Sequence, residues 1–335
     1  MSKRRDLFLE NTSPYGFKPE LLVNADEEMI RFRSPNATGY QVNWYGEDMV
    51  FFRPHFYRGE EKLPFLTSYE ALLRSVPSLD HIVIDSIDTH ALEQKMAAVD
   101  WFTAGPHYER LTEDALRQLH EIWPVMEQLK KTGNRAAANI VQDLQMKYWA
   151  DSGAEYYTRL DMRTDRYDRS YEFYVRQQHA GINIRQAYNL LCGRPLLRTE
   201  GSDNGMPYWL QLKPLMIPKS YEQFQEHRYP DFDLAEKLSI LPLKELRTEA
   251  EATALISGLQ AGDKVEAEIE STEGVIAVKL TVDPEAQAVS IQQQGSAPEI
   301  IRAIDDFNRL KYNKPLTQSP AHRSKPAKKR KRQGL

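Results

Sequence analysis

The sequence has one cysteine, Cys192, among its 335 residues. A lone thiol cannot form an internal disulfide or a multi-thiolate metal site, which excludes disulfide-stapled secreted folds. No apolar run approaches the ~18 residues of a membrane-spanning helix. The first residues, Met1-Ser-Lys-Arg-Arg-Asp6, are charged and no apolar stretch follows them, so they do not read as a secretory signal. We therefore expect a cytoplasmic protein with no membrane segment.

The sequence also lacks the common catalytic signatures. It contains no phosphate-binding Walker A loop, no Gly-x-Gly-x-x-Gly, no His-Glu-x-x-His and no Gly-x-Ser-x-Gly. Cys192 has no activating base near it in the sequence, so a reactive thiol is not expected. We expect no cofactor and no resident metal, and the sequence favours a binding protein over an enzyme.

Charge is divided unevenly along the chain. Residues 319–335 hold seven Lys or Arg and no acidic residue, whereas residues 1–318 carry 37 basic against 48 acidic side chains, a net charge of −11. The basic segment follows several prolines and has too few apolar residues to offset the entropy of ordering. We therefore predict a disordered basic tail over residues 315–335.

This tail is the main candidate for binding DNA or RNA. Dense cations displace counterions from a nucleic-acid backbone, which gives salt-sensitive binding without sequence preference. The alternatives are a solvated segment that aids solubility and a segment that folds back onto the acidic body. The candidate residues are Arg323, Lys325, Lys328, Lys329, Arg330, Lys331 and Arg332.

Residues 1–104 are expected to form a small α+β domain. Aromatic and β-branched runs at 40–45 and 48–53, separated by Gly46-Glu47, predict a β-hairpin. We expect a short helix over 67–73, a buried strand over 81–85 and a helix over 89–102. Aromatic residues gather around His55, and they form either the core of this domain or the lining of a pocket or partner groove. They are Tyr40, Trp44, Tyr45, Phe51, Phe52, Phe56 and Tyr57.

Residues 105–154 are predicted to form a helical hairpin. Apolar residues recur at three- and four-residue steps over 112–133 and 135–149, and Gly133 separates the two runs. From Glu155 the period changes to two, which predicts a β-hairpin over 155–176 with one wet face. Exposed aromatics beside guanidinium groups on that face could stack bases and bind phosphates, or form ordinary cross-strand ion pairs. These weaker candidates are Tyr157, Arg159, Arg163, Tyr174 and Arg176.

The rest of the 155–295 region contains a degenerate internal repeat. Each copy predicts a helix, a glycine in the left-handed conformation (Gly193 or Gly262) and then a β-hairpin. One such unit is too small to enclose a core, so we expect the two copies to pack together. A capping-box spacing at Ser296 then begins a last helix over 296–314.

The string that most resembles an enzyme site is His81-Ile-Val-Ile-Asp85-Ser-Ile-Asp88, which contains two acidic residues. Carboxylates just after a buried strand often hold Mg²⁺, and the spacing is loosely similar to that of topoisomerase and primase folds. Asp85 and Asp88 are therefore weak catalytic candidates of a metal-dependent nuclease or topoisomerase-like enzyme. A helix N-terminus explains both residues equally well, because carboxylates are favoured there.

Several strings in the second half occur together: Tyr208-Trp-Leu-Gln-Leu212, Tyr221-Glu-Gln-Phe224, Asp231-Phe-Asp-Leu234, Leu241-Pro-Leu-Lys-Glu-Leu246 and Leu255-Ile-Ser-Gly-Leu-Gln-Ala-Gly262. Over about residues 181–292 the chain resembles an uncharacterised domain family of Bacteroidota mobile and conjugative elements. A Lys- and Arg-rich C-terminus is also common in that family. The resemblance implies an accessory protein of horizontally moving DNA and provides no catalytic residues.

Together these features predict an α+β protein with a basic tail. The leading hypothesis is a non-enzymatic accessory protein of a mobile genetic element that binds an unidentified protein partner and, through the tail, DNA or RNA. The metal-dependent enzyme that uses Asp85 and Asp88 is one alternative. A pure protein-interaction module, with the repeat units as its docking surface, is the other.

Overall fold

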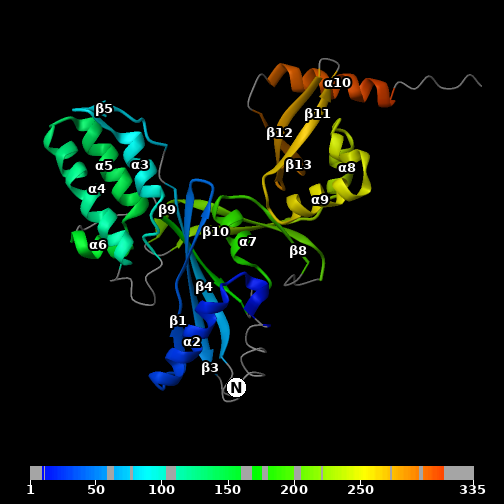
Figure 1. Cartoon of the computed structure of the whole chain (residues 1–335). Helices are drawn as coiled ribbons and strands as arrows, with labels where there is room; N and C mark the ends of the chain where they lie inside the picture. The colour runs from blue at the N-terminus through cyan, green and yellow to red at the C-terminus, as the bar shows by residue number, and fades with distance from the viewer. Residues whose placement is uncertain are drawn as a thin grey trace, which may run out of the picture. The chain divides into compact units, whose positions relative to one another are not determined.

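The computed structural model describes residues 10, 12–58, 64–75, 78–102, 111–159, 168–175, 180–199, 205–219, 222–271, 274–293 and 297–312. These residues form an α+β fold, as predicted, with four antiparallel sheets (Figure 1). The chain divides into two compact units. Unit 1 comprises residues 1–232, 258–263 and 282–287, and unit 2 comprises the remainder. No helix in the described part of the chain is long and apolar enough to cross a membrane.

A five-stranded antiparallel sheet forms the centre of unit 1. The predicted β-hairpin is confirmed: β2 and β3 pair from Gln41↔Phe52 to Tyr45↔Asp48, and Gly46 adopts φ +69° in the turn. The strand order is β1-β3-β4-β7, with β2 also beside β3. The strands are β1 (Asn36–Thr38), β2 (Gln41–Tyr45), β3 (Asp48–Arg58), β4 (Pro64–Arg74) and β7 (Asp168–Tyr174).

The prediction of a helix over 67–73 is wrong, because these residues belong to strand β4. β4 lies between β3 and β7 and is buried on both sides, so it lacks the polar–apolar alternation that marks a half-exposed strand. Thr67 is a bulge: His55 pairs with Ser68, but the next residue, Phe56, pairs with Leu66. The pairing of β4 with β3 on one edge and with β7 on the other outweighs the helix propensity of residues 67–73.

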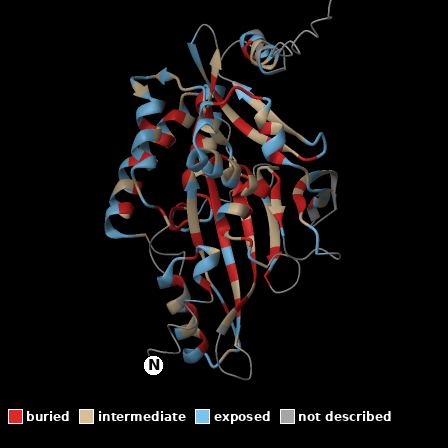
Figure 2. Cartoon of the chain, turned by 90° about the vertical axis from the view of Figure 1, so that its right-hand side faces the viewer, coloured by how far each residue is buried: buried red, intermediate tan, exposed pale blue. Residues whose placement is uncertain are grey.

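The main core of unit 1 lies around this sheet and a second sheet of order β10-β9-β8. Figure 2 shows the buried residues running along the long strands. Tyr69 on β4 stacks on Phe173 of β7 at 5.1 Å between ring centroids, and its hydroxyl donates to the Ile182 carbonyl. The other elements around this core are α2 (Pro19–Arg31), α7 (Ile184–Leu191), β8 (Leu196–Arg198), β9 (Tyr208–Lys219) and β10 (Glu222–Pro230), preceded by the 3-10 turn η1 (Ser13–Tyr15).

A helical insertion separates the neighbouring strands β4 and β7. It has its own core, in which Leu119, Met126 and Leu129 of α4 meet Ile140 and Leu144 of α5. The helical hairpin is thus present as predicted. Each helix begins with a side-chain cap: Thr112 accepts from Ala115 N, and Asn134 accepts from Ala136 N. The insertion contains β5 (Val83–Ile84), β6 (Ile87–Asp88), α3 (Thr89–Ala97), α4 (Glu113–Lys131), α5 (Arg135–Tyr148) and α6 (Gly153–Thr158).

Two strand predictions in this region are wrong. The expected buried strand 81–85 is only the two-residue β5, and Val83 is 71% exposed. The expected hairpin over 155–176 is replaced by helix α6 and by β7, which pairs with β4 instead. Ser152 caps α6 by accepting from Ala154 N, and the Glu155 carboxylate accepts from Asp151 N. The Ser-x-x-Glu spacing of a helix start was therefore present in the sequence, where the alternating aromatics concealed it.

Arg74 connects the ends of the insertion to the sheet. Its fully buried guanidinium donates to Asp168 at the start of β7 (2.7 Å) and to Asp151 after α5 (2.6 Å). It also donates to the Ala150 carbonyl and lies over the Phe51 ring. Burial alone would lower the pKa of Arg74, but the two carboxylates outweigh burial and raise it. Arg74 therefore stays charged, and its three polar contacts fix two chain segments, residues 150–151 after α5 and Asp168 at the start of β7.

Unit 2 contains a three-stranded sheet of order β11-β12-β13 with helices around it. β11 and β12 pair without interruption from Val265↔Leu280 to Ser271↔Gly274, as the second repeat copy predicted, and the last helix is present as α10. β13 was not predicted. The elements are α8 (Leu234–Ser239), η2 (Lys244–Arg247), α9 (Glu249–Gln260), β11 (Val265–Ser271), β12 (Gly274–Asp283), β13 (Ala288–Gln293) and α10 (Ala297–Tyr312).

Both repeat copies fold as a helix followed by an antiparallel strand pair: α7, β8 and β9 in the first, and α9, β11 and β12 in the second. Both glycines adopt left-handed φ, +75° at Gly193 and +78° at Gly262. The turn after α9 belongs to unit 1, where the Asn189 amide donates to the Ala261 carbonyl and to Asp263, each at 2.9 Å. Within unit 1, this turn of the second copy thus contacts helix α7 of the first.

Candidate binding pocket

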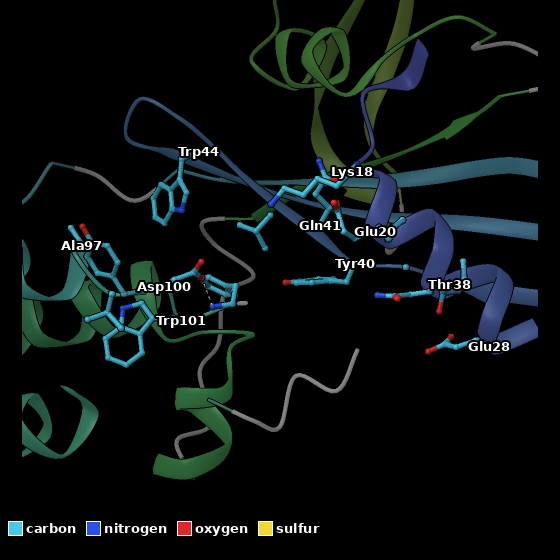
Figure 3. A pocket seen from close by; sticks show the side chains of 18 of the residues that line it. Lys18, Glu20, Glu28, Thr38, Tyr40, Gln41, Trp44, Ala97, Asp100 and Trp101 are labelled. Carbon is cyan, nitrogen blue, oxygen red and sulfur yellow. Dashed lines mark hydrogen bonds between the residues drawn. The ribbon is translucent and has the colours of Figure 1, made fainter. Parts of the chain in front are cut away.

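A cavity of about 600 Å³ opens in unit 1 (Figure 3). Three chain segments that are distant in the sequence form its walls: helix α2, the stretch from Thr38 to Trp44, and residues 97–102 after α3. Tyr148 at the end of α5 closes one side. A cavity of this size can hold a ligand of small-molecule dimensions.

Helix α2 contributes a polar wall. Pro19 occupies its first turn, where the missing N–H costs nothing, and the Lys18 N–H before it donates to Gln41 Oε1 at 2.8 Å. Glu20, Asn24 and Glu28 follow at four-residue spacing, so they lie on one face of the helix, and all three line the cavity. This wall therefore presents two carboxylates and an amide.

The strand side contributes aromatic rings. Tyr40 lies 5.7 Å from Phe51 between ring centroids, and Phe51 in turn lies 5.6 Å from Phe102. Trp44, 43% exposed, lies 6.0 Å from Tyr148. The rings thus form two contacting groups, each of which reaches from the sheet side to the insertion, and four of the five rings, all except Phe51, line the cavity.

The segment after α3 is held in place by hydrogen bonds. The buried Trp101 indole donates to the Met96 carbonyl at 2.8 Å and packs edge-on against Trp149. Asp100 Oδ1 accepts from the Phe102 N–H at 3.0 Å, the dashed line in Figure 3. This local turn leaves the second carboxylate oxygen of Asp100, a residue that lines the cavity, outside that bond.

A polar network positions Tyr148 from behind. Glu93 Oε1 accepts from Lys147 Nζ (2.9 Å) and Tyr148 Oη (3.2 Å), and Glu93 Oε2 lies 2.8 Å from His81 Nε2. Burial raises the pKa of the Glu93 carboxyl, but these partners outweigh burial and the net pKa lies below its usual value. Burial, then the Glu93 charge, raises the pKa of Tyr148. Tyr148 is therefore a neutral phenol with a fixed ring at ordinary pH.

The predicted aromatic cluster around His55 separates into different environments. Phe51, Phe52 and Phe56 are buried, in agreement with the core interpretation. Tyr40 and Trp44 line the cavity, in agreement with the pocket interpretation. The remaining two, Tyr45 and Tyr57, pack respectively against Tyr188 at 4.2 Å and Phe65 at 5.6 Å.

Asp85 and Asp88 lie at opposite ends of a tight turn. Asp85 has φ +48° in the turn between β5 and β6, whereas the Asp88 side chain accepts from the His90 N–H as the N-cap of α3. Asp88 thus has the helix-capping role that was the alternative to metal binding. In the described part of the chain no group of three or more His, Cys, Asp or Glu is arranged to hold a metal ion.

The weaker nucleic-acid candidates do not share a strand face. Tyr157 lies on helix α6, Arg159 has φ +52° at its end, and Tyr174 is on β7, where its hydroxyl donates to Glu172 at 2.7 Å. The wet face predicted for them does not form, because α6 is helical. Arg163, Arg176 and the whole tail from 315 to 335 lie outside the described residues.

Comparisons of the chain with models of protein families, with curated proteins and with solved structures find no match. The assignment of this cavity as a binding pocket therefore depends on its geometry alone. The sequence indicated Tyr40 and Trp44 but not the polar wall of α2 or the 97–102 segment. No local pattern could have indicated them, since these segments meet only through the tertiary fold.

Proposed function

We propose that this chain is a non-enzymatic, cytoplasmic accessory protein of a bacterial mobile genetic element. It binds DNA or RNA without sequence preference through the basic tail over residues 315–335, and a protein partner through its folded part. The observation that carries the proposal is the division of charge: seven cations in the last 17 residues, against a net −11 in residues 1–318. The resemblance of residues 181–292 to mobile-element proteins supports the genomic setting.

Ion pairing along strand β11 favours this role over a tail that folds back. Glu266, Glu268 and Glu270 alternate along β11, and each has a basic partner within unit 2. Their partners are Lys279 (3.3 Å), Lys244 (2.6 Å) and Arg247 (2.6 Å). These carboxylates are already neutralised locally, so they attract a further cation weakly. A nucleic acid offers the tail a much denser row of negative charges.

The expected binding depends strongly on salt. Each neutralised phosphate contributes about −0.9 to the slope of log K against log salt concentration, so seven contacts would give about −6. The full chain and a chain ending at Gln318 would be titrated with an arbitrary duplex and a single strand of DNA between low and physiological salt. We expect the truncated chain to lose most of its affinity and nearly all of its slope.

A matched variant separates charge from length. Replacing Lys325, Lys328, Lys329, Arg330, Lys331 and Arg332 with Gln keeps the tail's length, and we expect it to behave like the truncated chain. Equal affinity or equal slope in all three proteins would refute a role for the tail. A nuclease-treated pull-down from the native host addresses the partner. A protein retained by both the full and the truncated chain would identify the folded part as its binding surface.

A further inference from the structure

Glu28, the half-buried carboxylate of the pocket, differs from several other partly buried carboxylates of unit 1 in its surroundings. Asp26 pairs with Arg58 at 2.7 Å, Glu93 with Lys147 at 2.9 Å, and Asp168 with Arg74 at 2.7 Å. Glu28 is half-buried at the cavity wall, and among the described residues no basic side chain lies within ion-pair distance of it or of Glu20. A protein usually pairs a carboxylate that it removes from water, so the half-buried Glu28 is suited to a partner from outside, whereas Glu20 is exposed and adds its charge at the edge of the cavity.

The cavity as a whole has an excess of negative charge. Glu20, Glu28 and Asp100 line it, against the single cation Lys18. Low-dielectric walls concentrate such a charge imbalance and attract a cation into the space between them. The three carboxylates come from two separate walls, α2 and the segment after α3, so an entering cation would meet them from different sides.

The aromatic wall favours the same kind of ligand. Tyr40, Trp44 and Tyr148 line the cavity of about 600 Å³, and the face of each aromatic ring carries partial negative charge. A cation over such rings is stabilised by cation–π attraction, and an apolar body attached to that cation is stabilised by ring stacking. Because Tyr148 is held by Glu93, part of this wall is pre-organised.

We propose that the pocket binds a small organic cation, a ligand in which an ammonium, amidinium or guanidinium group is attached to a planar or apolar body. The charged group is held by the carboxylate of Glu28, with Glu20 two helical turns away adding to the negative charge of the wall, and the body lies against the rings of Tyr40 and Trp44. This site lies in unit 1 and is independent of the basic tail. It adds a ligand-binding activity to the proposed nucleic-acid binding.

Benzamidine and benzamide provide the test, since the two have nearly the same shape and only benzamidine is charged at pH 7. The full chain would be titrated with each, following indole N–H resonances by NMR and heat by calorimetry. We expect benzamidine to bind at least about tenfold more tightly than benzamide, as one charge-assisted contact implies. The indole of Trp44 should shift on binding, whereas that of the buried Trp101 should shift less.

The variant E20Q/E28Q keeps the shape of the wall and removes its charge. We expect it to bind benzamidine about tenfold more weakly and benzamide unchanged. E27Q, on the same helix but outside the cavity lining, is the matched control and should bind both as the original chain does. Equal binding of the two probes by the original chain, or no binding of either, would overturn the proposal even if a variant failed to fold. Equal benzamidine affinity of E20Q/E28Q and E27Q would overturn the assigned residues.

Discussion

The two helix–hairpin copies follow one chain pattern in two different environments. In the first, helix α7 buries six of its eight residues within unit 1, and β9 continues past its partner to pair with β10. In the second, α9 buries chiefly Leu255 and Leu259, and β11 presents paired charges to solvent. The same pattern therefore determines the local fold, while the neighbouring elements determine how much each position contributes to stability.

The two left-handed glycines show this difference most clearly. A Cβ on Gly262 would lie 2.8 Å from the Pro195 carbonyl oxygen and 3.2 Å from Asn189 Cβ. A Cβ on Gly193 would meet its nearest atom, the Leu212 carbonyl oxygen, at an ordinary 3.9 Å. Of the two, only Gly262 is required by close packing as well as by its backbone angle.

The largest effect is therefore expected from Gly262→Ala. It should lower the free energy of unfolding by about 3 kcal/mol, from left-handed strain plus overlap with backbone. Gly193→Ala should cost only the strain, about 1 kcal/mol. All five tryptophans lie in unit 1, so tryptophan fluorescence during urea unfolding reports this unit specifically. Equal losses in the two variants would contradict the contrast between the copies.

An intermediate effect is expected at Asn189, whose buried amide connects α7 to the turn after α9. Asn189→Ala leaves the Ala261 carbonyl without this donor and should cost about 2 kcal/mol. Arg185 contacts the same Asp263 oxygen at 3.0 Å from a half-exposed position, so Arg185→Ala should cost less than about 1 kcal/mol. Fluorescence-detected unfolding would rank the two. A greater loss from Arg185→Ala would show that the exposed pair dominates this contact.

The smallest effect is expected in unit 2. The Arg247–Glu270 pair has side chains 66% and 34% exposed, so Arg247→Gln should change stability by less than about 1 kcal/mol. Because unit 2 has no tryptophan, the loss of far-UV circular dichroism is the suitable signal. The difference should shrink further at high salt. A loss of stability from Arg247→Gln as large as that from Asn189→Ala would contradict this expectation and would mean that exposed ion pairs contribute substantially to the stability of unit 2.

Sequence patterns predicted the elements that depend on local chemistry. The two helices of the hairpin and the left-handed glycines are set by a few neighbouring residues, and these predictions are confirmed. The errors fall where distant pairing decides. Strand β4 is buried between two strands and reads locally as a helix, and β7 pairs with β4 across 93 intervening residues.

The same reasoning applies to the pocket. Tyr40 and Trp44 belong to a run dense enough in aromatics to suggest a pocket, and both line it. Glu20 and Glu28 are ordinary surface-type residues on an amphipathic helix, and nothing in their spacing distinguishes them from the exposed Glu27. Only the tertiary arrangement selects them.

The position of the helical insertion between β4 and β7 has a kinetic consequence. Closing so long a loop before the strands pair is entropically costly, and such non-local pairing slows folding. Helices α4 and α5 make mainly local contacts and have their own apolar core, so they can form early. Once they have formed, the loop between the strand ends is effectively shorter, and Arg74 can draw Asp151 and Asp168 together. The ion pairs of the Arg74 guanidinium thereby fix the register in which β4 and β7 pair.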